Sequence, residues 1–192
     1  GSGGHGHVFV GANVPYGLVQ LGPSSIPQEW DWTSGYHISD STVIGFPHMH
    51  LSGTGIGDLH DITHMPVTGQ VTYARGVEND PTSGLWSYSD RSKEVVKPGY
   101  YATHLLRYNV DVELTATKRV GFHKYTFNQK ENAAVVFDLQ NGGCWDSPTK
   151  AYINKVDDKT IEGYRYSSGW ANDQRVFFVA EFSEPITSLD VI

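Results

Sequence analysis

Positive charge is missing from the first 74 residues, which contain no lysine or arginine, because all 14 basic residues lie from Arg75 onward. The formal net charge of the chain is −7. Nucleic-acid binding depends on clustered lysine and arginine side chains that neutralise phosphates. The charge distribution therefore argues against a nucleic-acid partner and favours a neutral polyol or a bound cation as ligand.

Cysteine is almost absent, since Cys144 is the single one, and no disulfide framework can form within the chain. A lone cysteine is most often a small apolar residue, and no partner base is evident, so we predict no nucleophilic role for it. No apolar run approaches the length of about 20 residues that a membrane span needs. Residues 1–4 lack the charged and apolar regions of a signal peptide.

Helical periodicity is also missing, because no window shows an apolar stripe at i, i+3, i+4 and i+7. Residues 110–120 instead alternate between apolar and polar, which predicts a half-buried antiparallel strand. Further strands are predicted at residues 8–10, 18–21, 69–75, 120–127, 133–139 and 175–182. Residues 133–139 are apolar enough to be covered on both faces, and residues 151–167 predict a hairpin that turns at 157–159. The sequence therefore predicts an all-β fold, an antiparallel β-sandwich of two packed sheets.

Residues 30–61 gather aromatic residues, histidines, aspartates and glycines in one short run. Here Asp31 stands between the indoles of Trp30 and Trp32, and a flat apolar plate beside a hydrogen-bond acceptor suits a sugar ring. The glycines at 53, 55 and 57 allow positive φ and a close approach of backbone to ligand. Buried tryptophans usually belong to a core, and such a glycine run can form only a tight turn. The density of the cluster favours a binding site.

Histidines occur in three close pairs, His5/His7, His48/His50 and His60/His64. A single His-x-His pair is a weak signal for zinc. The spacing of His60 and His64 would suit zinc on a helix, but Gly57 and Pro66 bracket this stretch and oppose a helix. We therefore predict no metal ligand in this chain. A histidine-rich metalloprotein remains an alternative that metal analysis would test.

The chain closely resembles the N-terminal domain of the glycoside hydrolase family 92 α-mannosidases in four motifs, GSGGHGHVFVGANVPYGLVQLGP, WDWTSGYHISDSTVIGFPHMHLSGTGIGDLHDITHMPVTG, ELTATKRVGFHKYTF and GYRYSSGWANDQRVFFVAEF. The similarity covers essentially the whole chain in the same order. It implies that residues 1–192 form a β-sandwich of the galactose mutarotase-like supersandwich type, which packs on an (α/α)6 barrel domain of the same polypeptide. Because the last residues resemble a strand without a cap, we expect an excised piece that is truncated at its C-terminus.

The resemblance implies an inverting, calcium-dependent exo-α-mannosidase of the α-1,2 type that acts on a mannose-containing glycan, either an N-glycan or a mannan. Inversion requires a carboxylic acid and a carboxylate base roughly 6.5–9.5 Å apart. From the residues alone, Asp31 and Asp58 would be candidates for this pair. The family supplies both carboxylates and the Ca²⁺ ligands mainly from the C-terminal domain, so we predict no catalytic residue here and an inactive isolated chain. The family resemblance also leads us to expect an extracellular or periplasmic location in bacteria.

Eight residues are predicted to contact the sugar or the adjoining domain, namely His5, His7, Trp30, Asp31, Trp32, His37, His50 and Thr54. Asp31 is expected to accept hydrogen bonds from sugar hydroxyls or to hold a loop, and Asp58 to serve a turn or an inter-domain contact. Trp86, Trp145 and Trp170 are predicted to lie in the core or at a domain interface. The alternative function is a free-standing carbohydrate-binding β-sandwich without catalysis.

Overall fold

The computed structural model describes residues 1–143 and 145–192, so that Cys144 and its predicted lack of a nucleophilic role lie outside the described residues. The described part contains short 3-10 helices, at η1 Gly4–Gly6, η2 Trp30–Trp32, η3 Pro81–Ser83 and η4 Arg91–Lys93. The strands are β1 Ala12–Asn13, β2 Gln20–Leu21, β3 Thr42–Val43, β4 Thr63–Val67, β5 Ser87–Tyr88, β6 Val95–Lys97, β7 Tyr100–Leu105, β8 Val110–Ala116, β9 Gly121–Phe127, β10 Ala134–Asp138, β11 Ser147–Lys155, β12 Thr160–Ser168 and β13 Gln174–Glu181. All their pairings are antiparallel, and the predicted all-β fold class is confirmed.

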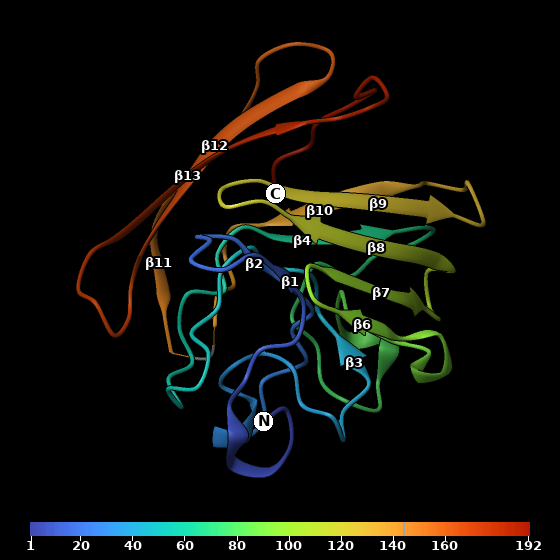
Figure 1. Ribbon diagram of the computed structural model, residues 1–192. Coiled ribbons are helices and arrows are strands. Elements are labelled where there is room, and N and C mark those ends of the chain that lie inside the picture. The colour runs from blue at the N-terminus through green and yellow to red at the C-terminus, as the bar shows by residue number, and fades with distance from the viewer. Residues whose placement is uncertain (144) are drawn as a thin grey trace.

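The largest sheet is an antiparallel meander with the strand order β6-β7-β8-β9 (Figure 1). The alternation predicted for residues 110–120 is confirmed in β8, where Val110, Val112 and Leu114 are buried and the residues between them are more exposed. These side chains pack with Phe46 and Met65 into the hydrophobic core. One face of the sheet therefore covers the core, as period-two patterning requires.

A second sheet, with the order β11-β12-β13, extends away from the rest of the molecule at one side (Figure 1). The predicted hairpin is confirmed, because β11 and β12 pair along their length and turn between Lys155 and Thr160. The predicted strand at residues 175–182 corresponds to β13. Large apolar side chains of β13 remain exposed, with Phe177 at 66% and Val179 at 71%.

Several predicted strands are shorter than expected or are wrong. Residues 69–75 form no strand, because Gly69 has a φ of +70° and its N–H donates to the backbone carbonyl of Glu131. This conformation turns the chain away after β4. The run at 8–10 is not a strand, and the run at 18–21 shrinks to β2. The strand predicted at 133–139 exists as β10, but it pairs only with β4 and is half-buried rather than covered on both faces.

The three remaining tryptophans differ in their surroundings. Trp86 is fully buried, which confirms the core placement. Trp145 and Trp170 are 52% and 70% exposed, so a core position is wrong for both, and a domain interface stays a prediction. Both lie in the irregular connections that flank β11 and β12.

Substitution of Val112 tests the core assignment of β8. Val112→Ala removes two methyl groups from a fully buried site, and we expect a loss of about 2 kcal/mol in the free energy of unfolding. The matched control is Thr126→Ala on β9, which removes an exposed side chain and should change stability by less than about 0.5 kcal/mol. Chemical denaturation of both variants measures the difference, and equal midpoints would contradict the assignment.

Candidate functional site

Three segments that are distant in the sequence form one surface around η2. The N–H of Gly53 donates to the carbonyl of His7 at 2.5 Å, and the N–H of Phe9 donates to Ser52 Oγ at 3.2 Å. The indole N–H of Trp30 donates to the carbonyl of Gly55 at 2.9 Å. The N-terminal loop, η2 and the glycine-rich loop are thus fixed to one another by hydrogen bonds, each of which involves at least one backbone group.

Four of the predicted sugar-contacting residues meet on this surface. The Nδ1 atom of His5 donates to Asp31 Oδ1 at 2.7 Å, and the Nε2 atom of His7 lies 3.4 Å from the same oxygen. The ring centroids of Trp30 and His7 are 4.2 Å apart, and Trp30 is 54% exposed. The hydrogen bond from His5 lowers the pKa of Asp31. The result is an ionised acceptor beside an exposed indole face.

Gly53 and Gly55 differ in what a side chain at each position would contact. Gly53 and Gly55 have φ values of +78° and +66°, a conformation that L side chains rarely adopt. A Cβ at Gly55 would lie 2.9 Å from Trp30 Cζ2, whereas a Cβ at Gly53 would meet nothing within 4 Å. Only Gly55 therefore leaves room for the Trp30 ring.

Trp32 and His37 form a neighbouring pair rather than part of the same group. Their rings stack with centroids 4.4 Å apart, and the indole N–H of Trp32 donates to Asp40 Oδ2 at 2.7 Å. His37 is 8% exposed and its Nδ1 forms a hydrogen bond with Ser39 Oγ at 2.7 Å. Trp32 extends the aromatic surface from η2, while His37 lies mostly beneath it.

The structure separates His50 and Thr54 from that group. His50 is 4% exposed, donates through Nδ1 to the carbonyl of Gln20 at 2.7 Å, and stacks on Phe9. Burial lowers its pKa to about 4. Thr54 is exposed next to Gly55, and its Oγ1 accepts from the N–H of Ile56 within its own turn. His50 is therefore buried against Phe9 of the N-terminal segment, whereas Thr54 is exposed on the glycine-rich loop.

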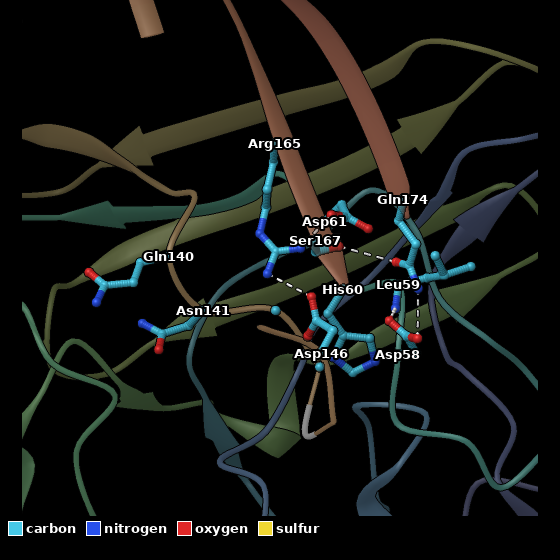
Figure 2. Close-up of polar contacts among 12 residues, drawn as sticks. Asp58, Leu59, His60, Asp61, Gln140, Asn141, Asp146, Arg165, Ser167 and Gln174 are labelled. Carbon is cyan, nitrogen blue, oxygen red and sulfur yellow. Dashed lines mark hydrogen bonds and ion pairs between the residues drawn. The ribbon is translucent and has the colours of Figure 1, made fainter. Parts of the chain in front are cut away.

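Asp58 anchors the glycine-rich loop to the β11–β13 sheet (Figure 2). Its side chain is fully buried and accepts hydrogen bonds from the N–H of Leu59, the N–H of Trp170 and the amide of Gln174, all within 2.8 Å. A carboxylate that is enclosed and occupied by three donors has no access to a substrate. Asp58 therefore has a structural role within this chain, and its fully buried side chain is not available for the inter-domain contact that was the expected alternative to a turn.

A buried ion network lies next to Asp58 (Figure 2), and sequence reasoning missed it. The guanidinium of Arg165 on β12 contacts Asp61 Oδ1 and Asp146 Oδ2, each at 2.6 Å, with all three side chains fully buried. No sequence spacing relates these residues, since Arg165 and Asp61 are 104 positions apart. The network joins the central loops to the second sheet.

A polar pocket of about 380 Å³ opens beside Asp146 and is also lined by Arg75, Asn141 and Gly142. None of the eight predicted residues lines this pocket. On the predicted surface, Trp30 is 54% exposed. The pocket and the predicted sugar surface are therefore two different places on the molecule.

The group of possible metal-ligand side chains that the structure brings together is not suited to calcium. Calcium takes six to eight oxygen ligands. Over residues 1–143 and 145–192, the one group of three His, Cys, Asp or Glu side chains that could share an ion consists of His48, His64 and His123. Burial lowers the pKa of all three imidazoles, so they are neutral at pH 7. Three imidazole nitrogens do not provide the oxygen ligands that calcium takes.

A family model and solved structures of known proteins both point to the same family. The model of the glycosyl hydrolase family 92 N-terminal domain matches residues 1–192. The structure of the family GH92 α-mannosidase BT3965 from Bacteroides thetaiotaomicron, in complex with mannoimidazole, is 36% identical with a TM-score of 0.93, over 97% of this chain and 24% of that one. The GH92 family glycosyl hydrolase ccman5 shares the fold, with 22% identity and a TM-score of 0.78, over 96% of this chain and 25% of that one.

A curated relative points in the same direction. An uncharacterized secreted glycosidase from Arthroderma benhamiae is 27% identical over 128 residues, which are 64% of this chain and 16% of that protein. The chain thus spans about a quarter of the length of the solved relatives and less of this one. Among the described residues, no helix is long and apolar enough to cross a membrane.

Proposed function

The chain belongs to glycoside hydrolase family 92, and from this premise we propose that it is the substrate-shaping N-terminal domain of an inverting exo-α-mannosidase. The enzyme removes terminal α-mannose, of the α-1,2-linked type, from N-glycans or mannans. One observation in this chain supports the proposal most: the exposed indole of Trp30 lies beside the ionised carboxylate of Asp31. An aromatic plate next to an acceptor matches the apolar face and the hydroxyl rim of a sugar ring.

The polar groups around Trp30 can orient a sugar. Asp31, whose side chain is 20% exposed, would accept hydrogen bonds from sugar hydroxyls through the acceptor positions that His5 leaves free. Asp31 has two carboxylate oxygens with about four acceptor positions, of which His5 uses one. The surface therefore has both an apolar plate and unused hydrogen-bonding capacity, which a bound monosaccharide would engage.

The surroundings of Asp31, Asp58 and Asp61 favour a catalytic acid and a catalytic base that lie elsewhere in the polypeptide. A general acid must be protonated near neutral pH, whereas the pKa of Asp31 is lowered by His5. Asp58 is enclosed by three donors, and Asp61 is buried against Arg165. We therefore propose that both catalytic carboxylates, and the Ca²⁺ ligands, belong to an adjoining (α/α)6 barrel domain, and that this chain alone is inactive.

The proposed location is extracellular or periplasmic. The support is the fungal relative, which is named as secreted, and the expectation that glycan substrates lie outside the cytoplasm. Detection of the native protein in the periplasmic or culture fraction, with a cytoplasmic marker as control, tests this proposal.

Removal of the Trp30 indole tests the proposed sugar surface. In the full-length enzyme, Trp30→Ala should lower kcat/KM for α-1,2-mannobiose by about 10- to 100-fold, since a buried tryptophan contact contributes about 2 kcal/mol at a binding surface. The control is Tyr16→Ala, which removes a fully exposed aromatic ring outside the three segments. Equal kcat/KM values for Trp30→Ala and the wild type would contradict the assignment of Trp30.

The two glycines of the loop give a matched pair of substitutions. Gly55→Ala and Gly53→Ala both place an L side chain at positive φ, at a cost of about 1–2 kcal/mol. Only Gly55→Ala also pushes Trp30 aside, so it alone should lower kcat/KM, by about 10-fold or more. Equal kinetic losses in the two variants would show that the position of Trp30 does not matter.

A free-standing carbohydrate-binding domain is the second candidate function. It is favoured by the fact that the contacts holding Trp30, with Gly55 and His7, all come from this chain. In that case the isolated chain would bind mannose with an affinity that calorimetry detects. The two-domain proposal expects no measurable affinity, because half of the sugar pocket is absent from the isolated chain.

A further inference from the structure

Three histidines from distant parts of the sequence meet beside β9. His48 precedes β4, His64 lies within β4, and His123 lies within β9. Their ligand nitrogens all lie within 4.8 Å of one another, and the Nε2 atoms of His48 and His123 are 3.0 Å apart. This grouping crosses the three sequence pairs, since it takes one histidine each from two of them and adds His123.

The hydrogen bonds around the cluster leave its nitrogens directed inward. His48 donates through Nδ1 to the carbonyl of Ile62 at 2.8 Å, so its Nε2 carries a lone pair. The Nδ1 atom of His123 lies 2.7 Å from Tyr125 Oη, which can accept from it. Histidines that bind metals characteristically donate their other ring N–H to a carbonyl or another acceptor, which fixes the tautomer. Two of the three rings have such a partner.

The third ring has an unused nitrogen. His64 is 7% exposed, and its Nε2 is buried without a hydrogen-bond partner. Its ring centroid lies 4.7 Å from that of His48 and 4.6 Å from that of His123. A buried ring nitrogen without a partner, on an imidazole that packs against two others, indicates a ligand that all three would share.

Gly121 provides the space that the cluster needs. A Cβ at this position of β9 would lie 2.7 Å from Cδ2 and 2.9 Å from Nε2 of His48. The φ of Gly121 is outside the left-handed region, so its backbone conformation does not demand glycine. The absence of a side chain allows the His48 ring to approach β9 closely.

From this geometry we propose that His48, His64 and His123 bind one first-row transition-metal ion of the zinc type. Three imidazoles are a recurrent ligand set for zinc, whereas calcium takes oxygen ligands. The ion would connect the loop at His48 to β4 and β9 and so brace the segment that leads into the glycine-rich loop. This inference does not depend on the proposed mannosidase activity.

Metal titration of the tag-free full-length protein tests the proposal. After treatment with chelator, the wild type should bind one equivalent of Co²⁺ with the visible absorption bands of nitrogen ligation, and Zn²⁺ should displace it. His64→Ala should weaken Co²⁺ binding by about 100-fold or more, and Tyr125→Phe by about 10- to 100-fold. His104→Ala is the control, because His104 is also buried but pairs with Asp111 outside the cluster.

The outcomes separate clearly. Stoichiometric binding that is lost in His64→Ala and weakened in Tyr125→Phe, but kept in His104→Ala, supports the site. Absence of Co²⁺ and Zn²⁺ binding by the folded wild type overturns it, and the cluster is then a set of imidazoles that hydrogen-bond to one another. Binding that Tyr125→Phe and His64→Ala leave unchanged also overturns it. Because the wild-type titration stands alone, misfolding of His64→Ala would not protect the proposal.

Discussion

Replacing Arg165 with methionine should lower the free energy of unfolding by about 3–5 kcal/mol. The guanidinium lies between the carboxylates of Asp61 and Asp146, at 2.6 Å from each, and also donates to the carbonyl of Leu139. Methionine keeps much of the side-chain volume but no charge, so two buried carboxylates lose their positive partner. The large effect comes from those stranded charges rather than from a cavity.

The pKa shifts of Asp61 and Arg165 reflect their mutual attraction. Burial raises the pKa of Asp61, and Arg165 opposes that rise by Coulomb attraction and by its hydrogen bond. Burial by itself would lower the pKa of Arg165, but the two carboxylates raise it. In Arg165→Met the pKa of Asp61 should rise further, so part of the lost stability should return at acidic pH, where Asp61 is protonated.

Arg175→Met is the matched control for Arg165→Met. Arg175 lies on β13, and its Nη2 atom is 2.8 Å from Asp173 Oδ2. Both of these side chains are more than half exposed. An exposed pair of this kind contributes little to stability, because solvent screens the two charges. Urea denaturation of both variants measures the contrast, and a similar loss of stability in the two would refute the buried network as a major source of stability.

Acidification from pH 7 to pH 4 should destabilise the fold, with His50 alone contributing about 3 kcal/mol. The pKa of His50 is lowered by burial to about 4, while the unfolded chain has the ordinary value of 6.5. Between these values the unfolded state binds more protons than the folded state, so stability falls as the pH falls. The stabilising contribution is complete above pH 6.5 and is lost progressively down to about pH 4.

His50→Asn tests this pH dependence. Asparagine keeps a donor that can reach the carbonyl of Gln20 but cannot take up a proton. The variant is expected to be less stable than the wild type at pH 7, yet to lose less stability between pH 6.5 and pH 4. Denaturation midpoints across that range measure the slope, and an unchanged slope would show that His50 is not a source of the acid sensitivity.

The strands of the C-terminal half were predictable because their sequence follows a local rule. β8 alternates in exposure as its residues alternate in polarity, and the β11–β12 hairpin turns at polar residues. The strand β4 was not predictable, since all of Thr63–Val67 is buried and its pattern lacks alternation. The run at 69–75 has alternation but ends up outside the sheets, because the turn at Gly69 overrides local propensity.

The candidate site was predictable only in part, for a similar reason. Trp30, Asp31 and the glycine-rich loop all fall within the aromatic- and histidine-rich run at residues 30–61, so the density of the cluster was visible. Nothing in the sequence showed that His50 would be buried or that His123 would join His48 and His64. Those contacts depend on tertiary packing between segments that share no motif.

Hydrolysis of α-1,2-mannobiose by this chain alone and by the full-length protein, each with calcium and with chelator, tests the central claim most directly. We predict that only the full-length protein cleaves the disaccharide, and only with calcium, since in the proposed function this chain shapes the sugar site and the adjoining domain supplies the acid and the base. Cleavage by this chain alone would contradict that account, and Asp31 would then return as a candidate catalytic carboxylate.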